Sequence, residues 1–265
     1  EAGVDGLRLN PGNIGSEHKV REVVAAARLH QVPIRIGVNT GSIDKDIYQR
    51  YGVSAEGLVE SAFKHVNILE QAGFEEIKIS VKASTVPLML ASYRLLSQRV
   101  DYPLHLGVTE AGTFLAGTVR SCVAMSTLLQ EGIGDTLRVS LSDQPANEIR
   151  VGLELLRSLG LREPGANVIA CPTCGRIQVD VISLAGEIEK KLEAYYAENP
   201  EHNRPLVAVM GCMVNGPGEA KDADIAIAGG DGKFALYLKG VLVKTVAENA
   251  ALDAVMEQVS AWKGK

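Results

Sequence analysis

Five short segments in the first part of the chain alternate apolar residues with polar residues or glycine at every second position. This period-two pattern predicts β-strands whose two faces differ in polarity. Between them lie stretches with apolar residues at helical spacing, and the alternation of strand and helix predicts βα units with a parallel sheet. The expected strands are 7–10, 34–39, 77–82, 104–109 and 137–142, and the expected helices are 16–31, 54–72, 86–99, 113–131 and 145–159.

The two faces of these strands point to different surroundings. One face is apolar and suits contact with helices, whereas ordinary parallel sheets are apolar on both faces. In a (β/α)8 barrel the second face is the interior, and active sites form where the strands end. Clustered cations there favour an anion such as phosphate, which guanidinium groups bind well. The alternative is a solvated face of an open sheet. The second face carries Arg8, Asn10, Arg35, Asn39, Lys78, Ser80, Lys82, His105, Thr109, Arg138 and Ser140.

We therefore expect an α/β fold in which residues 1–162 form the last five βα units of a (β/α)8 TIM-type barrel. Five strands do not close an eight-stranded barrel, so the sequence is expected to be a piece of a longer protein. Alone, such a piece is expected to be inactive and poorly stable, because an open barrel exposes strand edges. Residues 163–265 are expected to form a smaller α+β domain, with strands at 168–170, 177–181, 205–209, 225–228, 235–238 and 241–243 and a closing helix at 247–262.

Three cysteines of this second domain have the spacing of a metal centre. Cys171 and Cys174 are separated by two residues, and Cys212 lies in a loop rich in glycine and proline. Soft thiolates select zinc or an iron–sulfur cluster. Structural zinc usually has four closed ligands, whereas three cysteines with a different fourth ligand suit a [4Fe–4S] cluster. Glu219, just beyond Gly-Pro-Gly, is the candidate for that fourth position.

Other interpretations of the cysteines stay open at this point. Cys171 and Cys174 alone could form a thioredoxin-like redox pair, although that chemistry does not need Cys212. Cys122 differs from all three, because it lies in an apolar pattern with helical spacing. We expect it to be a buried, small apolar side chain.

The composition of the chain narrows the range of possible binding partners. Of the 265 residues, 46% are hydrophobic, and the net charge is −5. The mean hydropathy is +0.07, and we find no apolar run long enough to span a membrane. The acidic balance gives no general attraction to nucleic acid. We expect a cytoplasmic protein with neither membrane nor nucleic acid as a partner.

Seven motifs together resemble the 4-hydroxy-3-methylbut-2-enyl diphosphate synthase family, the iron–sulfur enzymes of the non-mevalonate isoprenoid pathway. The resemblance runs along the whole chain and is of the bacterial type. The motifs are LRLNPGNIG at 7–15, IRIGVN at 34–39, SVKAS at 80–84, HLGVTEAG at 105–112, GIGDTLRVS at 132–140, ACPTCGR at 170–176 and GCMVNGPGEA at 211–220.

The resemblance implies an oxidoreductase acting on 2-C-methyl-D-erythritol 2,4-cyclodiphosphate by reductive ring opening, with a hydroxyl lost as water. It implies a flavodoxin or ferredoxin as electron donor, and a head-to-tail homodimer in which the cluster domain of one subunit covers the barrel mouth of the other. Glu110 and His105 are the implied catalytic groups, together with Glu219. The implied substrate-binding residues are Arg8, Asn10, Arg35, Asn39, Lys82, Arg138 and Ser140, and the implied ligands of a [4Fe–4S] cluster are Cys171, Cys174, Cys212 and Glu219.

Two competing functions use the same residues differently. A zinc-stabilised α/β module would bind a phosphorylated ligand through its cations, and Glu219 would then be incidental. A haem-coupled reductase of the sulfite or nitrite kind would need four cysteines near its cluster, whereas only three are in suitable places.

Overall fold

The structure is a computed structural model that describes residues 3–10, 14, 16–214, 218 and 220–264. The chain divides into two compact units, Glu1–Leu161 and Arg162–Lys265. Each unit is organised around its own apolar core. Separate cores are what distinguishes two domains from one.

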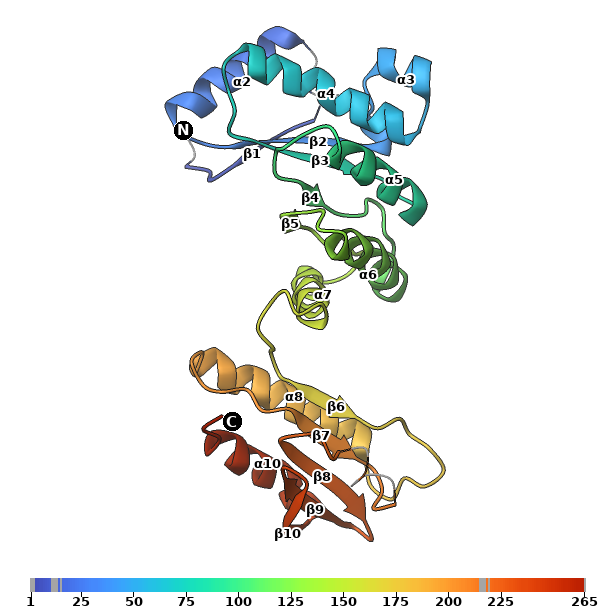
Figure 1. Cartoon of the computed structure of the whole chain (residues 1–265), viewed down its shortest axis with the longest axis vertical. Coiled ribbons are helices and arrows are strands. Elements are labelled where there is room, and N and C mark those ends of the chain that lie inside the picture. Colours follow the sequence, from blue (N-terminus) through green and yellow to red (C-terminus); the bar gives the residue numbers. More distant parts are fainter. Residues whose placement is uncertain (1–2, 11–13, 15, 215–217, 219, 265) are drawn as a thin grey trace. The chain divides into compact units, whose positions relative to one another are not determined.

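Parallel strands in chain order form the sheet of the first unit (Figure 1). Strands β1 (Leu7–Leu9), β2 (Ile34–Asn39) and β3 (Ile77–Lys82) pair in that order, and β4 (His105–Leu106) pairs with β5 (Thr136–Leu137). A parallel bridge between Ile79 and Leu104 connects the two groups. Within the described residues these strands do not close a barrel.

The expected strands are confirmed in position, but the last two are shorter than predicted. The backbone continues the parallel pairing at single points, where Arg138 donates to Leu106 and Thr109 donates to Ala83, each over 3.0 Å. Isolated bonds of this kind do not make a ladder, so the strands end early although the chain remains alongside its neighbour.

Helices cover one face of this sheet, as the apolar strand face predicted. The structure confirms α2 (Glu17–Leu29), α4 (Ala55–Gln71), α5 (Val86–Ser97), α6 (Phe114–Gln130) and α7 (Pro145–Ser158). In Figure 1, α2 and α4 lie together over β1–β3. The buried side chains of α4 include Leu58, Val66 and Leu69, and all three belong to the core of this unit.

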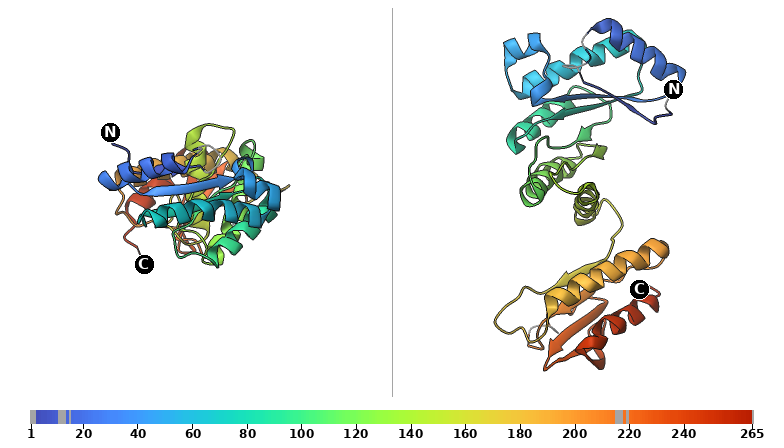
Figure 2. Two further views of the ribbon diagram at one scale, coloured as in Figure 1. Left: turned by 90° about the horizontal axis from the view of Figure 1, so that it is seen from above. Right: turned by 180° about the vertical axis from the view of Figure 1, so that it is seen from behind.

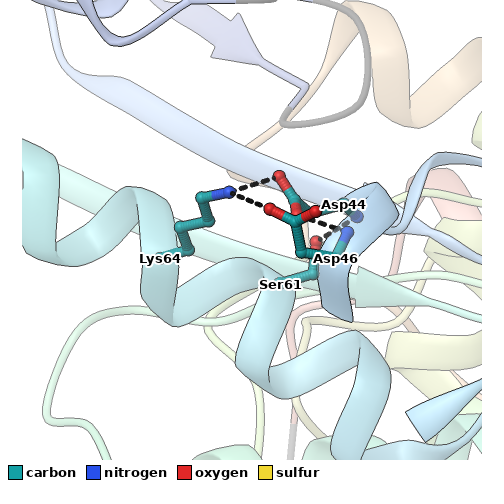
Figure 3. Close-up of polar contacts among 4 residues, drawn as sticks. All are labelled: Asp44, Asp46, Ser61 and Lys64. Carbon is teal, nitrogen blue, oxygen red and sulfur yellow. Dashed lines mark hydrogen bonds and ion pairs between the residues drawn. The ribbon is translucent and has the colours of Figure 1, made fainter. Parts of the chain in front are cut away.

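A short α-helix of the first unit and the 3-10 turn Thr40–Ser42 before it were not predicted. Helix α3 (Lys45–Tyr51) begins after Asp44, whose carboxylate accepts a hydrogen bond from the Asp46 backbone over 3.1 Å. Figure 3 shows Lys64 of α4 between Asp44 and Asp46, at 2.7 and 3.8 Å, with the Ser61 hydroxyl accepting from the Asp44 N–H. Burial alone would raise the pKa of Asp44, but the hydrogen bond and charge of Lys64 outweigh it and lower that pKa. The ion pair therefore holds the segment that follows β2 against α4.

The second unit is a mixed five-stranded sheet with helices on one side. Strands β6 (Val168–Ala170), β7 (Val207–Met210) and β8 (Ile225–Gly230) are parallel, and β9 (Lys233–Leu238) and β10 (Val241–Ala247) are antiparallel. Figure 2 shows α8 (Val181–Glu198) and α10 (Ala251–Ser260) on one side of this sheet. A 3-10 turn, Glu248–Ala250, precedes α10, so the closing helix is shorter than the expected 247–262.

The strand expected at 177–181 is wrong. In this segment the Gln178 N–H donates to the Gly211 carbonyl. Helix α8 already begins at Val181, where the Asp180 carboxylate caps it by accepting a hydrogen bond from the Ser183 N–H over 3.0 Å. The apolar side chain of Ile177 packs on Gly211, where a Cβ would lie 2.9 Å away. Apolar residues in this segment therefore pack as an irregular turn, not as a strand.

Within the described residues, no helix is long and apolar enough to cross a membrane.

Candidate functional site

The strand register brings the predicted cations of the first unit into rows. Arg8 lies beside Arg35, and Arg35 lies beside Lys78 on the next strand. Four residues further along, Asn39 pairs with Lys82. We call the basic side chains gathered here the basic face, which consists of Arg8, Arg35, Lys78, Lys82, His105 and Arg138.

Two glycines leave space for the basic side chains. Arg8 lies over Gly37, donating from Nη2 to the Gly37 carbonyl over 3.0 Å, and a Cβ at Gly37 would lie 2.5 Å from Arg8 Nε. At Gly107 a Cβ would lie 2.8 Å from both Lys82 Nζ and the Arg138 carbonyl oxygen. The sequence signal for both was available, because each glycine occupies a second-face position in a predicted strand.

Lys82 is the most perturbed cation of the basic face. Its residue is 5% exposed, and its Nζ has no hydrogen-bond partner in the part of the chain that the structure describes. Burial lowers the pKa of Lys82 to about 6, helped by the charges of Arg138, Arg35 and Arg8. A buried ammonium that lacks a partner and faces like charges is stabilised by an anion. Such a perturbed group marks a binding or catalytic site.

His105, the first residue of β4, belongs to the basic face, and its surroundings favour the neutral imidazole. Burial, followed by the charge of Lys82, lowers the pKa of His105 to about 3. Its Nδ1 lies 2.9 Å from Thr136 Oγ1, and its carbonyl oxygen accepts from the Tyr93 hydroxyl over 2.6 Å. Tyr93 is completely buried, and burial raises the pKa of its phenol. Sequence reasoning missed Tyr93, because it belongs to the apolar pattern of α5 and nothing local marks its hydroxyl.

A pocket of about 310 Å³ opens on the basic face where the strands begin. Arg8, Arg35 and His105 line it together, whereas Asn39 and Lys82 end their strands and Ser140 follows β5. The predicted substrate residues are thus spread along the face. The residues that line the pocket are Asp5, Gly6, Leu7, Arg8, Pro33, Arg35, Lys78, His105 and Thr136.

The segments that carry Glu110 and Ser140 are joined after the strands end. Glu110 is exposed and follows β4, and Ser140 is half-buried and follows β5. The Ser142 N–H donates to the Gly112 carbonyl over 2.9 Å, and the Leu141 N–H donates to Glu148 Oε1 over 2.7 Å. The half-buried Asn10 follows β1 on the same side. The structure therefore brings the two loops together at the carboxyl ends of the strands.

The second unit brings its cysteine segments to one sheet edge. Ala170 pairs with Val209 in neighbouring parallel strands, so Cys171 and Gly211 follow these strands at the same end. The Gly211 N–H donates to Cys171 Sγ over 3.1 Å. Cys212, which is 7% exposed, comes directly after.

Cys174 is connected to the same edge through the backbone. The Ile177 N–H donates to Cys174, and the Gln178 N–H donates to Gly211, over 3.2 and 3.0 Å. The thiolate is the form of cysteine that binds metals. The donor chemistry fits a soft metal centre.

Two further observations concern the possible metal ligands at this edge. Among the described residues, no three His, Cys, Asp or Glu side chains form a ready-made metal-binding group. Glu219 lies outside the described residues. Cys122 is separate from this edge: it lies in α6 and packs against the core of the first unit, where burial raises the pKa of its thiol.

Fold and side chains together define an α/β protein with a basic face in one unit and cysteine-bearing segments at one end of a sheet in the other. Residues 1–153 match the GcpE TIM-barrel domain, and residues 167–261 match the GcpE protein C-terminal domain. The chain belongs to the GcpE family.

Relatives in bacteria cover nearly the whole chain. It is 56% identical over 260 residues to a protein of Geobacter sulfurreducens, covering 98% of this chain and 72% of the relative. It is 53% identical to a protein of Symbiobacterium thermophilum, covering 98% and 69%, and 52% identical to one of Desulfotalea psychrophila, covering 98% and 71%. All three are named 4-hydroxy-3-methylbut-2-en-1-yl diphosphate synthase (flavodoxin).

Proposed function

We propose that this chain carries out the reaction for which its relatives are named, the formation of 4-hydroxy-3-methylbut-2-enyl diphosphate. The substrate is 2-C-methyl-D-erythritol 2,4-cyclodiphosphate, whose ring is opened by two electrons with loss of a hydroxyl as water. The identity of 56% to a relative with that name is the observation that carries the proposal. The first unit is then part of a (β/α)8 barrel, which its parallel strands in chain order support.

The basic face holds the cyclic diphosphate. The guanidinium groups of Arg8, Arg35 and Arg138 supply the charge that a diphosphate needs, and the bound anion favours the ammonium form of the buried Lys82. Arginine binds such oxygens in a bidentate manner, and Lys82 contributes a point charge. Asn10, Asn39 and Ser140 add neutral hydrogen-bonding groups near the ends of the strands.

Cys171, Cys174, Cys212 and Glu219 hold a [4Fe–4S] cluster. When bound, the cluster supplies the electrons of the reduction. Cysteine thiolates suit iron of this kind, whereas the carboxylate of Glu219 is a hard ligand on a soft centre and is the ligand most easily exchanged. The two segments that carry the three cysteines follow β6 and β7 at the same end of the sheet, which supports this assignment.

Glu110 is the proton donor in this proposal. It follows β4 at the end of the sheet where barrel enzymes carry their catalytic groups. His105 acts as a neutral hydrogen-bonding group, because burial and the neighbouring cations lower its pKa to about 3 and so disfavour the imidazolium form.

The proposed partners are flavodoxin, as the electron donor named for the relatives, and a second copy of the chain. The copies pair head to tail, so that the cluster domain of one covers the barrel mouth of the other. An apolar stripe on α6 supports an interface on the first unit, because Leu115, Val119 and Val123 are 74%, 53% and 50% exposed.

Anaerobic reconstitution with iron and sulfide tests the metal centre. We expect about four iron and four sulfide per chain and a broad absorption near about 400 nm, as cysteine-held clusters show. Cys212→Ala should lose the absorption, whereas Cys122→Ala should keep it, since Cys122 lies in α6 and packs against the core of the first unit. Stoichiometric zinc without sulfide would instead support the zinc-stabilised module.

A further inference from the structure

Glu110 has an unusual backbone conformation. Its φ is 54°, which is the left-handed region that residues other than glycine rarely adopt. A strained residue of this kind persists only where its surroundings hold it, and such residues cluster at functional sites. The segment around Glu110 must therefore be fixed by specific contacts.

Three hydrogen bonds fix the segment on both sides of Glu110. Before it, the Thr109 N–H donates to Ala83 over 3.0 Å, and after it, the Gly112 carbonyl accepts from Ser142 over 2.9 Å. Both are backbone bonds to neighbouring strand ends. The third comes from a side chain: Arg120 Nη1 donates to the Ala111 carbonyl over 2.7 Å.

The Arg120 guanidinium lies close against this segment. Ala111 is 1% exposed, so its carbonyl has little access to water. Gly112 has a φ of 113°, and a Cβ there would lie 3.2 Å from Arg120 Nη1. The guanidinium thus covers the backbone directly after Glu110. Removing it leaves the Ala111 carbonyl without its charged donor, which is unfavourable for a buried acceptor.

Arg120 reaches the segment from α6, the helix that follows it. A lysine there offers one compact ammonium, whereas arginine presents several N–H groups in a planar fork. We therefore expect the contact to depend on the shape of the side chain as well as on its charge. Nothing in the motifs marks Arg120, because it lies on an exposed face of a helix.

We infer that Arg120 is a positioning residue that holds the Glu110 segment in its left-handed conformation. Through that segment it sets where the carboxyl group of Glu110 lies when it gives its proton. The second statement rests on the proposed function, whereas the first concerns the fold alone. Two measurements separate them.

Hydrogen exchange of the amides 109–113 tests the first statement without any activity. In Arg120→Met we expect exchange at least about 10-fold faster in this segment, with the rest of the first unit unchanged. The exchange rate of Arg120→Lys should lie between those of Arg120→Met and the wild type. Arg94→Met is the matched control, because Arg94 is an exposed arginine paired with Glu131. Unchanged exchange in Arg120→Met overturns the inference.

A double-mutant cycle in the full-length protein tests the second statement. We expect Arg120→Met to lower kcat about 10-fold with KM within about 2-fold, because positioning acts on the transition state. In a Glu110→Gln background the same change should lower kcat by less than about 2-fold. An equal loss in both backgrounds overturns the role through Glu110. A wild type without turnover contradicts the proposed function instead, and the exchange result still decides the first statement.

Discussion

Gly107 and Lys82 are complementary in shape: the Lys82 ammonium occupies the space that a side chain at Gly107 would need. The two residues end or follow neighbouring strands, and a Cβ at Gly107 would lie 2.8 Å from Lys82 Nζ. A missing side chain on one strand therefore allows a long cation on the next to fold back into the interior. The basic face depends on this arrangement.

Gly107→Ala should weaken the binding of the cyclic diphosphate at least about 10-fold, because the added methyl group displaces Lys82 and contacts the Arg138 carbonyl. Isothermal titration calorimetry measures the change. Gly186→Ala in α8 is the control, since a Cβ at Gly186 meets no atom within 4 Å. That control should leave affinity unchanged and raise stability by about 0.5–1 kcal/mol. Equal affinities for Gly107→Ala and the wild type would remove Gly107 from this role.

Lys82→Met should stabilise the protein while it weakens binding. It replaces a buried ammonium, which has no hydrogen-bond partner among the described residues, by an apolar side chain of similar length. We expect the free energy of unfolding to rise by about 1–3 kcal/mol. Denaturant unfolding measures it, with the exposed Lys190→Met as control. A loss of stability in Lys82→Met would show that its charge is compensated in the fold.

The stability of the wild type should rise with pH in a window set by Lys82. Its pKa is 10.5 in an unfolded chain and about 6 in the folded protein. Between these values the unfolded chain carries a proton that the folded chain lacks, so the free energy of unfolding rises with pH. Below about pH 6 both states are protonated and the destabilisation is complete. Thermal melts of wild type and Lys82→Met should differ most at low pH, and a constant difference from pH 5 to 10 would contradict this linkage.

Binding of a diphosphate should be coupled to proton uptake. An anion beside Lys82 favours the charged form and raises its pKa from about 6. At about pH 8 we expect uptake of up to about one proton per site, seen as a dependence of the calorimetric heat on the ionisation enthalpy of the buffer. Lys82→Met should lose this dependence. Equal heats in Tris and HEPES for the wild type would mean that Lys82 keeps its protonation state.

Pattern and spacing predicted the fold where the contacts are local. The alternation in β2 and β3 correctly predicted which face carries Arg35 and Lys82, because strand side chains point to opposite faces. The segment 177–181 was wrong, since its apolar residues pack on glycines that are distant in sequence. Helix α3 was missed because it is short and depends on the N-cap at Asp44 and on Lys64.

The arrangement of the candidate site was predictable in part. Charged residues at alternate strand positions predicted that basic side chains lie on one face of the sheet. The cysteine spacing predicted a shared centre; the structure places the segments after β6 and β7 at the same end of the sheet, and the ligand set stays a prediction. The neutral state of His105 could not be predicted from the sequence, because it arises from burial and from charges on other strands. Tyr93 and Arg120 were missed because both lie outside the motifs, although the carbonyls that they bind, those of His105 and Ala111, belong to the motif at 105–112.

Anaerobic turnover of the full-length reconstituted protein tests the central claim most directly. With reduced flavodoxin and 2-C-methyl-D-erythritol 2,4-cyclodiphosphate, the account predicts 4-hydroxy-3-methylbut-2-enyl diphosphate, with two electrons consumed per molecule. Cys212→Ala should abolish the product and Cys122→Ala should retain it. Product formed by the zinc-loaded protein, or by Cys212→Ala at the wild-type rate, would contradict the account.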